Sequence, residues 1–153
     1  MALVGGCVCG AVGYEILSEP LVVLACHCTD CQRSTGSAFV VNIGVPKADL
    51  RVEGELTTVT NPTPSGAGYD ANYCSACATV IWSKYHFIEI PMVAVRGGTL
   101  DDPFAVQPTV HIFTVSKQPW VNLPDGALSF PGWLDPETAL SERSRARMAA
   151  MAS

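Results

Sequence analysis

The chain has 153 residues, of which 48% are hydrophobic and 15% are charged, and its formal net charge is −5 at pH 7. This composition is typical of a globular domain with a buried core and excludes a disordered polar chain. The acidic balance and the lack of any Lys/Arg-rich run argue against nucleic-acid binding, because such runs are needed to neutralise phosphates.

The start of the chain predicts neither a signal peptide nor a membrane anchor. Residues 1–6 carry no basic segment, and no apolar run in the chain reaches the roughly 20 residues that a membrane span requires. We therefore expect a cytoplasmic protein with no nucleic-acid or membrane partner. Thiols stay reduced there, so clustered cysteines are more often metal ligands than disulfides.

Short apolar runs separated by glycine and proline predict a mainly β chain. In chain order, strands are expected at residues 8–16, 21–25, 38–45, 50–53, 56–60, 69–74, 79–83, 91–96 and 109–115. Strands 50–53 and 56–60 are expected to form a hairpin around Gly54, and strands 69–74 and 79–83 one whose tip holds Cys74 and Cys77. A helical turn is expected over 30–36, ended by Gly36.

The C-terminal part predicts an ordered loop followed by a helix. Residues 116–133 are rich in proline and glycine, and Trp120, Phe130 and Trp133 are expected to hold this loop down. Asp135 and Pro136 form a helix-start signal, which predicts a helix over 135–150. With no linker in the sequence, we expect a single domain over 1–153 with its core at about 5–133.

Seven cysteines divide into a group of four and a group of three. In an extended strand Cys7 and Cys9 would point to the same side, and the spacing of Cys74 and Cys77 is that of a tight knuckle. Together these four thiols form a ligand set for tetrahedral zinc that would tie the N-terminal strand to the later hairpin. Ala78 follows the knuckle where glycine is common, and a left-handed Ala there would cost about 1 kcal/mol.

Cys26, Cys28 and Cys31 lie within six residues and are expected to hold a second zinc ion with one open position, as catalytic zinc sites do. One alternative is a closed structural site completed by a histidine, for which His86 or His111 is better placed than His27. Another alternative is a redox pair of Cys28 and Cys31, although no thioredoxin-like context surrounds them.

The cysteine pattern resembles that of the glutathione-dependent formaldehyde-activating enzyme family. The resemblance rests on residues 6–12 and 26–36, with later blocks at 74–77, 96–103, 108–113 and 116–120, and it runs from about Gly5 to Trp133. It extends to the related centromere protein V. Ala78 departs from the family's usual glycine, which affects the turn of the knuckle rather than its ligands.

The resemblance implies a mainly β fold of the β-tent type, built from small antiparallel sheets stapled by zinc. It implies two zinc ions per chain, one structural ion held by Cys7, Cys9, Cys74 and Cys77 and one held at the open site by Cys26, Cys28 and Cys31. It further implies a carbon–sulfur lyase that condenses formaldehyde with glutathione to S-(hydroxymethyl)glutathione, and the reverse.

Several side chains are candidates for substrate contacts at the open site. Arg33 and Lys117 lie nearest in sequence for pairing a substrate carboxylate, and His111 could relay a proton, although each has a more ordinary structural interpretation. Two functional alternatives stay open: a zinc-stapled binding module without activity, and the same site acting on another thiol or carbonyl compound.

Overall fold

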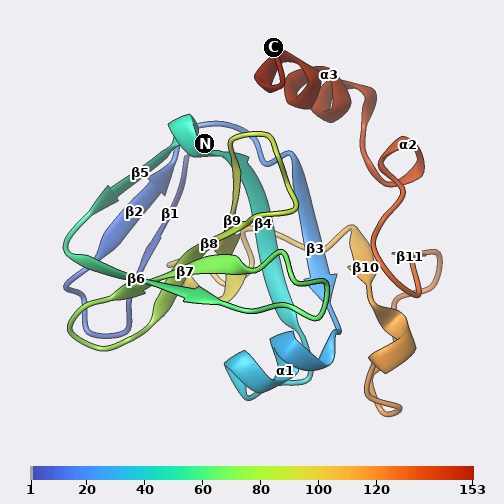
Figure 1. Cartoon of the computed structure of the whole chain (residues 1–153), viewed down its shortest axis with the longest axis horizontal. Helices are drawn as coiled ribbons and strands as arrows, with labels where there is room; N and C mark the ends of the chain where they lie inside the picture. The colour runs from blue at the N-terminus through green and yellow to red at the C-terminus, as the bar shows by residue number, and fades with distance from the viewer. Residues whose placement is uncertain (1) are drawn as a thin grey trace.

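The computed structural model describes residues 2–153, and its strands form two sheets (Figure 1). The smaller sheet has three antiparallel strands in the order β1-β2-β5. The larger sheet has eight strands in the order β11-β10-β3-β4-β9-β8-β7-β6. The strands are β1 Leu3–Gly6, β2 Gly13–Ile16, β3 Val22–Cys26, β4 Val40–Pro46, β5 Leu50–Glu53, β6 Leu56–Asn61, β7 Tyr69–Cys74, β8 Val80–Tyr85, β9 Met92–Arg96, β10 Val110–Ile112 and β11 Leu128–Ser129.

The helices are few and short, which confirms the mainly β prediction. They are α1 Thr29–Thr35, α2 Pro136–Ala139 and α3 Glu142–Met151, with 3-10 turns at Lys47–Asp49, Gly97–Thr99 and Thr114–Ser116. Most strand pairs are antiparallel, whereas β10 runs parallel to both β3 and β11. Among residues 2–153, no helix is both long and apolar enough to cross a membrane.

The two faces of the large sheet differ in what covers them. Along β9, Val93 and Val95 belong to a core cluster that also contains Val12, Tyr14 and Ile16 of the small-sheet region. Met92, Ala94 and Arg96 alternate with them and therefore point to the opposite face, where a cavity lies. A second core cluster, with Leu24, Ile112, Leu134 and Leu140 among its members, anchors the C-terminal segment to β3 and β10.

Two predicted strand arrangements are wrong. Residues 8–16 are not one strand, because Cys7 to Ala11 form a turn between β1 and β2, in which Gly10 adopts a φ of 78°. Residues 50–53 and 56–60 do not form a hairpin, since β5 belongs to the small sheet and β6 to the edge of the large one. Local apolar patterning predicts that a strand exists but not which strand it pairs with.

The predicted C-terminal helix is divided into two. Asp135 caps α2 as expected, its side chain accepting a hydrogen bond from the Glu137 backbone N–H. The chain then becomes extended at Leu140, which is buried, and Ser141 caps a new helix by accepting from the Ser144 N–H. A buried leucine followed by a capping serine ends one helix and starts the next.

Candidate functional site

The four-cysteine group joins the two sheets. Cys7 and Cys9 come from the β1–β2 turn, whereas Cys74 ends β7 and Cys77 lies in the β7–β8 turn. The four sulfurs all lie within 4.8 Å of one another, with Cys7 and Cys9 3.4 Å apart and Cys9 and Cys74 3.8 Å apart. Tetrahedral zinc with bonds of about 2.3 Å requires sulfur separations of about 3.8 Å, so this donor set fits the ion.

Hydrogen bonds favour the thiolate form of Cys7 and Cys77 in this group. The Val12 N–H donates to Cys7 Sγ over 3.2 Å, and the Thr79 hydroxyl lies 3.1 Å from Cys77 Sγ. The Thr79 contact is the main cause that lowers the pKa of the Cys77 thiol to about 6. Ala78 has a φ of 60°, which confirms that the knuckle needs a left-handed residue.

The three-cysteine group lies where β3 passes into α1. Cys26 is the last residue of β3, Cys28 is the N-cap of α1, and Cys31 lies in the first turn of α1. The three sulfurs lie within 4.8 Å of one another, and no His, Asp or Glu of residues 2–153 joins them. Three soft sulfur donors without a fourth protein ligand fit a zinc ion with an open coordination position.

The three thiols are close enough to shift one another's pKa values. Hydrogen bonds from Cys26 and Cys31 lower the pKa of Cys28 to about 2, and the Cys31 N–H also donates to its sulfur over 3.2 Å. The contact with Cys28 raises the pKa of Cys26 to about 12, and the contacts with Cys26 and Cys28 raise the pKa of Cys31 further. The three sulfurs therefore titrate as one group, and that group must release protons before it can bind a cation.

The histidines are outside both sulfur groups. His27 is fully buried, and its Nε2 lies 3.1 Å from Nδ1 of His111, which is also buried. His86 instead lies between Asp70 and the backbone of Ala67. The structure thus gives no histidine ligand to the three-cysteine group, and His111 does not line the cavity beside it.

A cavity of about 420 Å³ opens directly onto Cys26, Cys28 and Cys31. Its floor is the free face of the large sheet, to which β3 contributes Val22 and Leu24 and β9 contributes Met92 and Ala94. Its size falls within the usual range of small-molecule sites, roughly 300–1,000 Å³. The open side of the sulfur group therefore faces a space that can hold a substrate.

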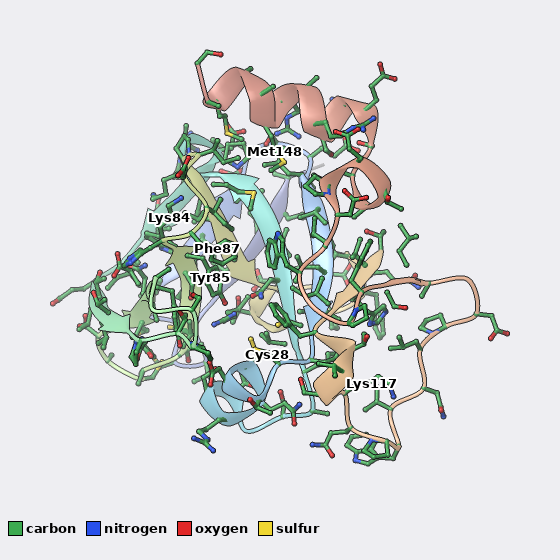
Figure 2. All side chains as sticks on the ribbon, turned by 45° about the vertical axis from the view of Figure 1, so that its right-hand side comes forward. Cys28, Lys84, Tyr85, Phe87, Lys117 and Met148 are labelled. Carbon is green, nitrogen blue, oxygen red and sulfur yellow. The ribbon has the colours of Figure 1, made fainter. Side chains whose placement is uncertain are left out.

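Aromatic rings from three separate segments form the wall of this cavity. They are Tyr69 of β7, Tyr85 and Phe87 at and beyond the end of β8, and Phe113 and Trp133 of the C-terminal segment. Figure 2 shows Tyr85 and Phe87 near one another, and it shows Cys28 below them in this view. Of the three predicted loop aromatics, Trp133 reaches the cavity, Phe130 packs into the adjacent core, and Trp120 is 71% exposed.

Arg96 is the cationic side chain of the cavity lining, and sequence reasoning did not assign it a role. It ends the apolar strand β9 and is 7% exposed. Its Nη1 donates to Asn42 Oδ1 over 2.5 Å, its Nη2 lies 3.5 Å from Ser83 Oγ, and its buried Nε has no partner. The sequence signal that could have found it is an arginine at the end of the apolar run 91–96, because a charged residue in a buried strand needs a partner.

The two cations that the sequence favoured are not brought to the cavity. Arg33 is exposed on α1 and is absent from the cavity lining. Lys117 donates through Nζ to the carbonyl oxygens of Gln118 and Val121, at 3.2 Å and 2.6 Å. Lys117 lies on the segment after β10, apart from Cys28 in Figure 2.

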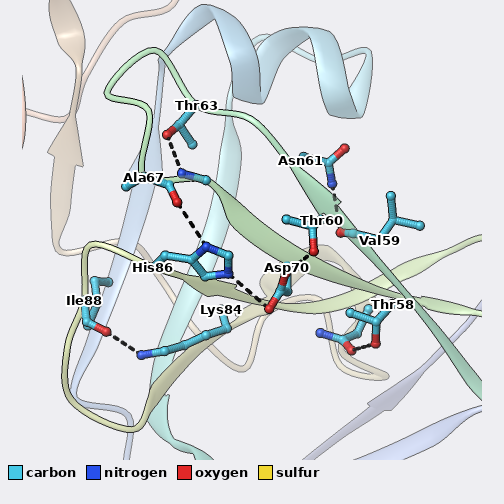
Figure 3. A network of polar contacts seen from close by, with 12 residues as sticks. Thr58, Val59, Thr60, Asn61, Thr63, Ala67, Asp70, Lys84, His86 and Ile88 are labelled. Atoms are coloured by element: carbon cyan, nitrogen blue, oxygen red, sulfur yellow. Dashed lines mark hydrogen bonds and ion pairs between the residues drawn. The ribbon is translucent and has the colours of Figure 1, made fainter.

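The β6–β7 loop closes one side of the cavity through Thr63, Pro64 and Ser65. His86 fastens this loop: its Nδ1 lies 3.0 Å from the Ala67 carbonyl and its Nε2 lies 3.1 Å from Asp70 Oδ2 (Figure 3). Both partners only accept hydrogen bonds, so the contacts favour the doubly protonated ring. The pKa of His86 is accordingly raised, chiefly by Asp70.

The fold and these two groups define a small β protein whose sheets are joined by clustered cysteines and whose second cysteine group opens into a cavity. The model of the glutathione-dependent formaldehyde-activating enzyme family matches residues 2–116, and the chain belongs to this family. The match includes all seven cysteines but stops short of the predicted end at Trp133.

One curated protein and one solved structure are similar to this chain. A Halomonas elongata protein, provisionally named a glutathione-dependent formaldehyde-activating enzyme, is 26% identical over 131 residues, or 80% of this chain and 82% of the relative. The crystal structure of a Rhodobacter sphaeroides protein is similar with a TM-score of 0.50 at 22% identity, covering 69% of this chain and 91% of that one. The second comparison supports the fold alone.

Proposed function

We propose that the protein is a zinc-dependent carbon–sulfur lyase that joins a thiol to an aldehyde and catalyses the reverse cleavage. The observation that carries the proposal is the opening of three cysteine sulfurs onto a cavity of about 420 Å³. Glutathione and formaldehyde are the substrates that the family name supplies. We place the enzyme in the cytoplasm, where its seven thiols would stay reduced.

In this proposal each cysteine group holds one zinc ion. Cys7, Cys9, Cys74 and Cys77 would hold a structural ion with four sulfur ligands, and Cys26, Cys28 and Cys31 would hold the second ion with three. Zinc in such an open site supplies Lewis acidity, which lowers the pKa of a bound thiol and polarises a carbonyl group.

The reaction needs a thiolate, a carbonyl carbon and a proton donor in one place. The sulfur forms a bond to the carbonyl carbon, the carbon–oxygen π electrons move to oxygen, and the proton that the thiol released ends on that oxygen. Cleavage retraces these steps, so neither direction needs an oxidant or a further reactant.

The side chains of the cavity suit this chemistry. Burial raises the pKa of Tyr85 to about 12, so its phenol stays protonated at neutral pH and can donate to the developing oxyanion. Phe87, Phe113 and Trp133 line the same cavity, and a substrate packed against them would displace water from beside the sulfurs. We assign Tyr85 as the proton donor.

Magnetisation-exchange NMR tests the proposal, because it measures the rate at which glutathione, formaldehyde and their adduct interconvert with and without the protein. The zinc-loaded protein is expected to raise the exchange rate at least about tenfold, and Cys28→Ser to abolish that gain. Arg33→Gln, on the same helix but outside the cavity, should behave as wild type.

The same experiment separates catalysis from a purely structural role. An exchange rate equal to that of the protein-free solution, with two zinc ions bound, would refute glutathione and formaldehyde as the substrates. The same result with other thiols would refute the proposed activity and favour a zinc-stapled binding module. Tyr85→Phe should retain zinc and lose most of the rate gain, and an undiminished rate would remove Tyr85 from the mechanism.

A further inference from the structure

Five aromatic rings follow one another around the cavity. The ring centroids of Tyr69 and Tyr85 are 5.3 Å apart, those of Tyr85 and Phe87 are 6.1 Å apart, and those of Phe87 and Trp133 are 4.9 Å apart in an edge-to-face arrangement. Phe113 continues the series at 6.3 Å from Trp133. Phe87 is 45% and Trp133 41% exposed, so large apolar surfaces stay uncovered at a concave site.

The sheet face beneath these rings is also apolar. Val22, Leu24, Met92 and Ala94 form it, and Gly44 deepens it between two of them. A Cβ added at Gly44 would lie 2.9 Å from Val22 Cγ1 and 3.6 Å from Met92 Sδ. The floor and wall therefore form one continuous apolar space.

The charges of the cavity are too few for a peptide such as glutathione, which carries two carboxylates and an ammonium group. Arg96 is the cation of the lining, and the only acid there, Asp30, is exposed on α1. Arg96 is buried with neutral partners, and its Nε is unpartnered. A buried guanidinium without a carboxylate has the capacity to bind one carboxylate of a ligand.

Part of the aromatic wall lies outside the region shared with the family. The family model ends at residue 116, whereas Trp133 reaches the cavity from beyond it. The wall is therefore completed by a residue outside the segment that the family model matches. Substrate selection can differ here while the sulfur chemistry is retained.

We propose that the substrate filling this cavity has an apolar, ring-sized body and a single carboxylate bound by Arg96. The aromatic rings and the sheet face enclose the body, and the sulfur group faces the reacting end. The inference rests on the proposed function in that the reacting end is a thiol or its aldehyde adduct.

Isothermal titration of the zinc-loaded full chain with four thiols tests this inference. The probes are 2-sulfanyl-3-phenylpropanoate, which has ring and carboxylate; 2-phenylethanethiol, which lacks the carboxylate; 2-sulfanylpropanoate, which lacks the ring; and glutathione. The first is expected to bind at least about tenfold more tightly than each of the other three.

Matched variants assign the two halves of the ligand. Arg96→Gln should abolish the roughly tenfold advantage of the phenyl acid over 2-phenylethanethiol, and Arg33→Gln should keep it. Trp133→Ala should weaken both phenyl thiols about tenfold while leaving 2-sulfanylpropanoate unchanged, and Trp120→Ala should change none of them. The affinity ratios separate a lost contact from a lost fold, because unfolding would weaken all probes together.

Glutathione binding as tightly as the phenyl acid in wild type would overturn the inference, as would an unchanged ratio in Arg96→Gln. If Arg96→Gln does not fold, the inference is tested by Trp133→Ala and Trp120→Ala. Equal affinities of these two variants for the phenyl thiols would overturn it. Tight binding of the phenyl acid without thiol–aldehyde exchange would refute the proposed activity alone. Exchange with glutathione, and none with the phenyl acid, would refute this inference alone.

Discussion

Replacing Ala78 by glycine should stabilise the protein through a single backbone angle. Ala78 follows the Cys74–Cys77 knuckle with a φ of 60°, and its N–H donates to the Cys74 carbonyl over 2.9 Å. A left-handed L-residue costs about 1–2 kcal/mol, whereas glycine adopts this conformation freely. The substitution keeps the hydrogen bond because that bond uses only the backbone.

The gain is reduced by the greater freedom of glycine in the unfolded chain, about 0.4–1 kcal/mol. The net increase in the free energy of unfolding is therefore about 1 kcal/mol, or about 2–4 °C in melting temperature for a chain of this size. Thermal and urea unfolding of the zinc-loaded protein measure it.

Ala76→Gly is the matched control, since Ala76 is also exposed in this turn and has no positive φ. It should destabilise by about 0.4–1 kcal/mol. If both variants shift stability in the same direction, the argument from the backbone angle fails.

Three further predictions concern stability and pH. Cys74→Ser should lower the melting temperature of the whole fold, because the four-cysteine group joins the two sheets. A melting temperature equal to that of wild type would show that this group does not hold the sheets together. Gly54→Ala should cost more than about 2 kcal/mol in chemical unfolding, since φ is 102° and the new Cβ would lie 2.3 Å from the Ala11 carbonyl oxygen. His86→Gln should cost most stability at pH below about 6.5, the ordinary histidine pKa. The pKa of His86 is raised in the folded state, so the stability that its protonated ring contributes is lost as the pH rises through this folded-state pKa. The melting temperatures of variant and wild type should therefore converge at alkaline pH. Curves separated by the same amount at every pH would rule out this titration.

Local sequence features predicted the parts of the fold that depend on neighbouring residues. The helical turn ended by Gly36 and the hairpin carrying Cys74 and Cys77 lie where their patterns indicated. The grouping of seven cysteines into four and three is also reproduced in space. Ligand spacing within short segments carries this information, because a turn brings such residues to one point.

The same reasoning did not predict which distant strands pair with one another. Nothing local in 50–53 and 56–60 indicates that they enter different sheets, and nothing local distinguishes Trp133 from the exposed Trp120. Arg33 was favoured because it is near the cysteines in sequence, whereas Arg96 reaches their cavity through the pairing of β9 with β4. The cavity combines segments that only the sheet topology brings together.

The most direct test of the four-plus-three arrangement is the number of zinc ions per chain, measured by native mass spectrometry on wild type and Cys28→Ser. We expect two ions in wild type and one in the variant, which should remain folded because its sheets are still joined by the other group. One ion in wild type, or unfolding of Cys28→Ser with loss of both ions, would contradict an open site held by Cys26, Cys28 and Cys31.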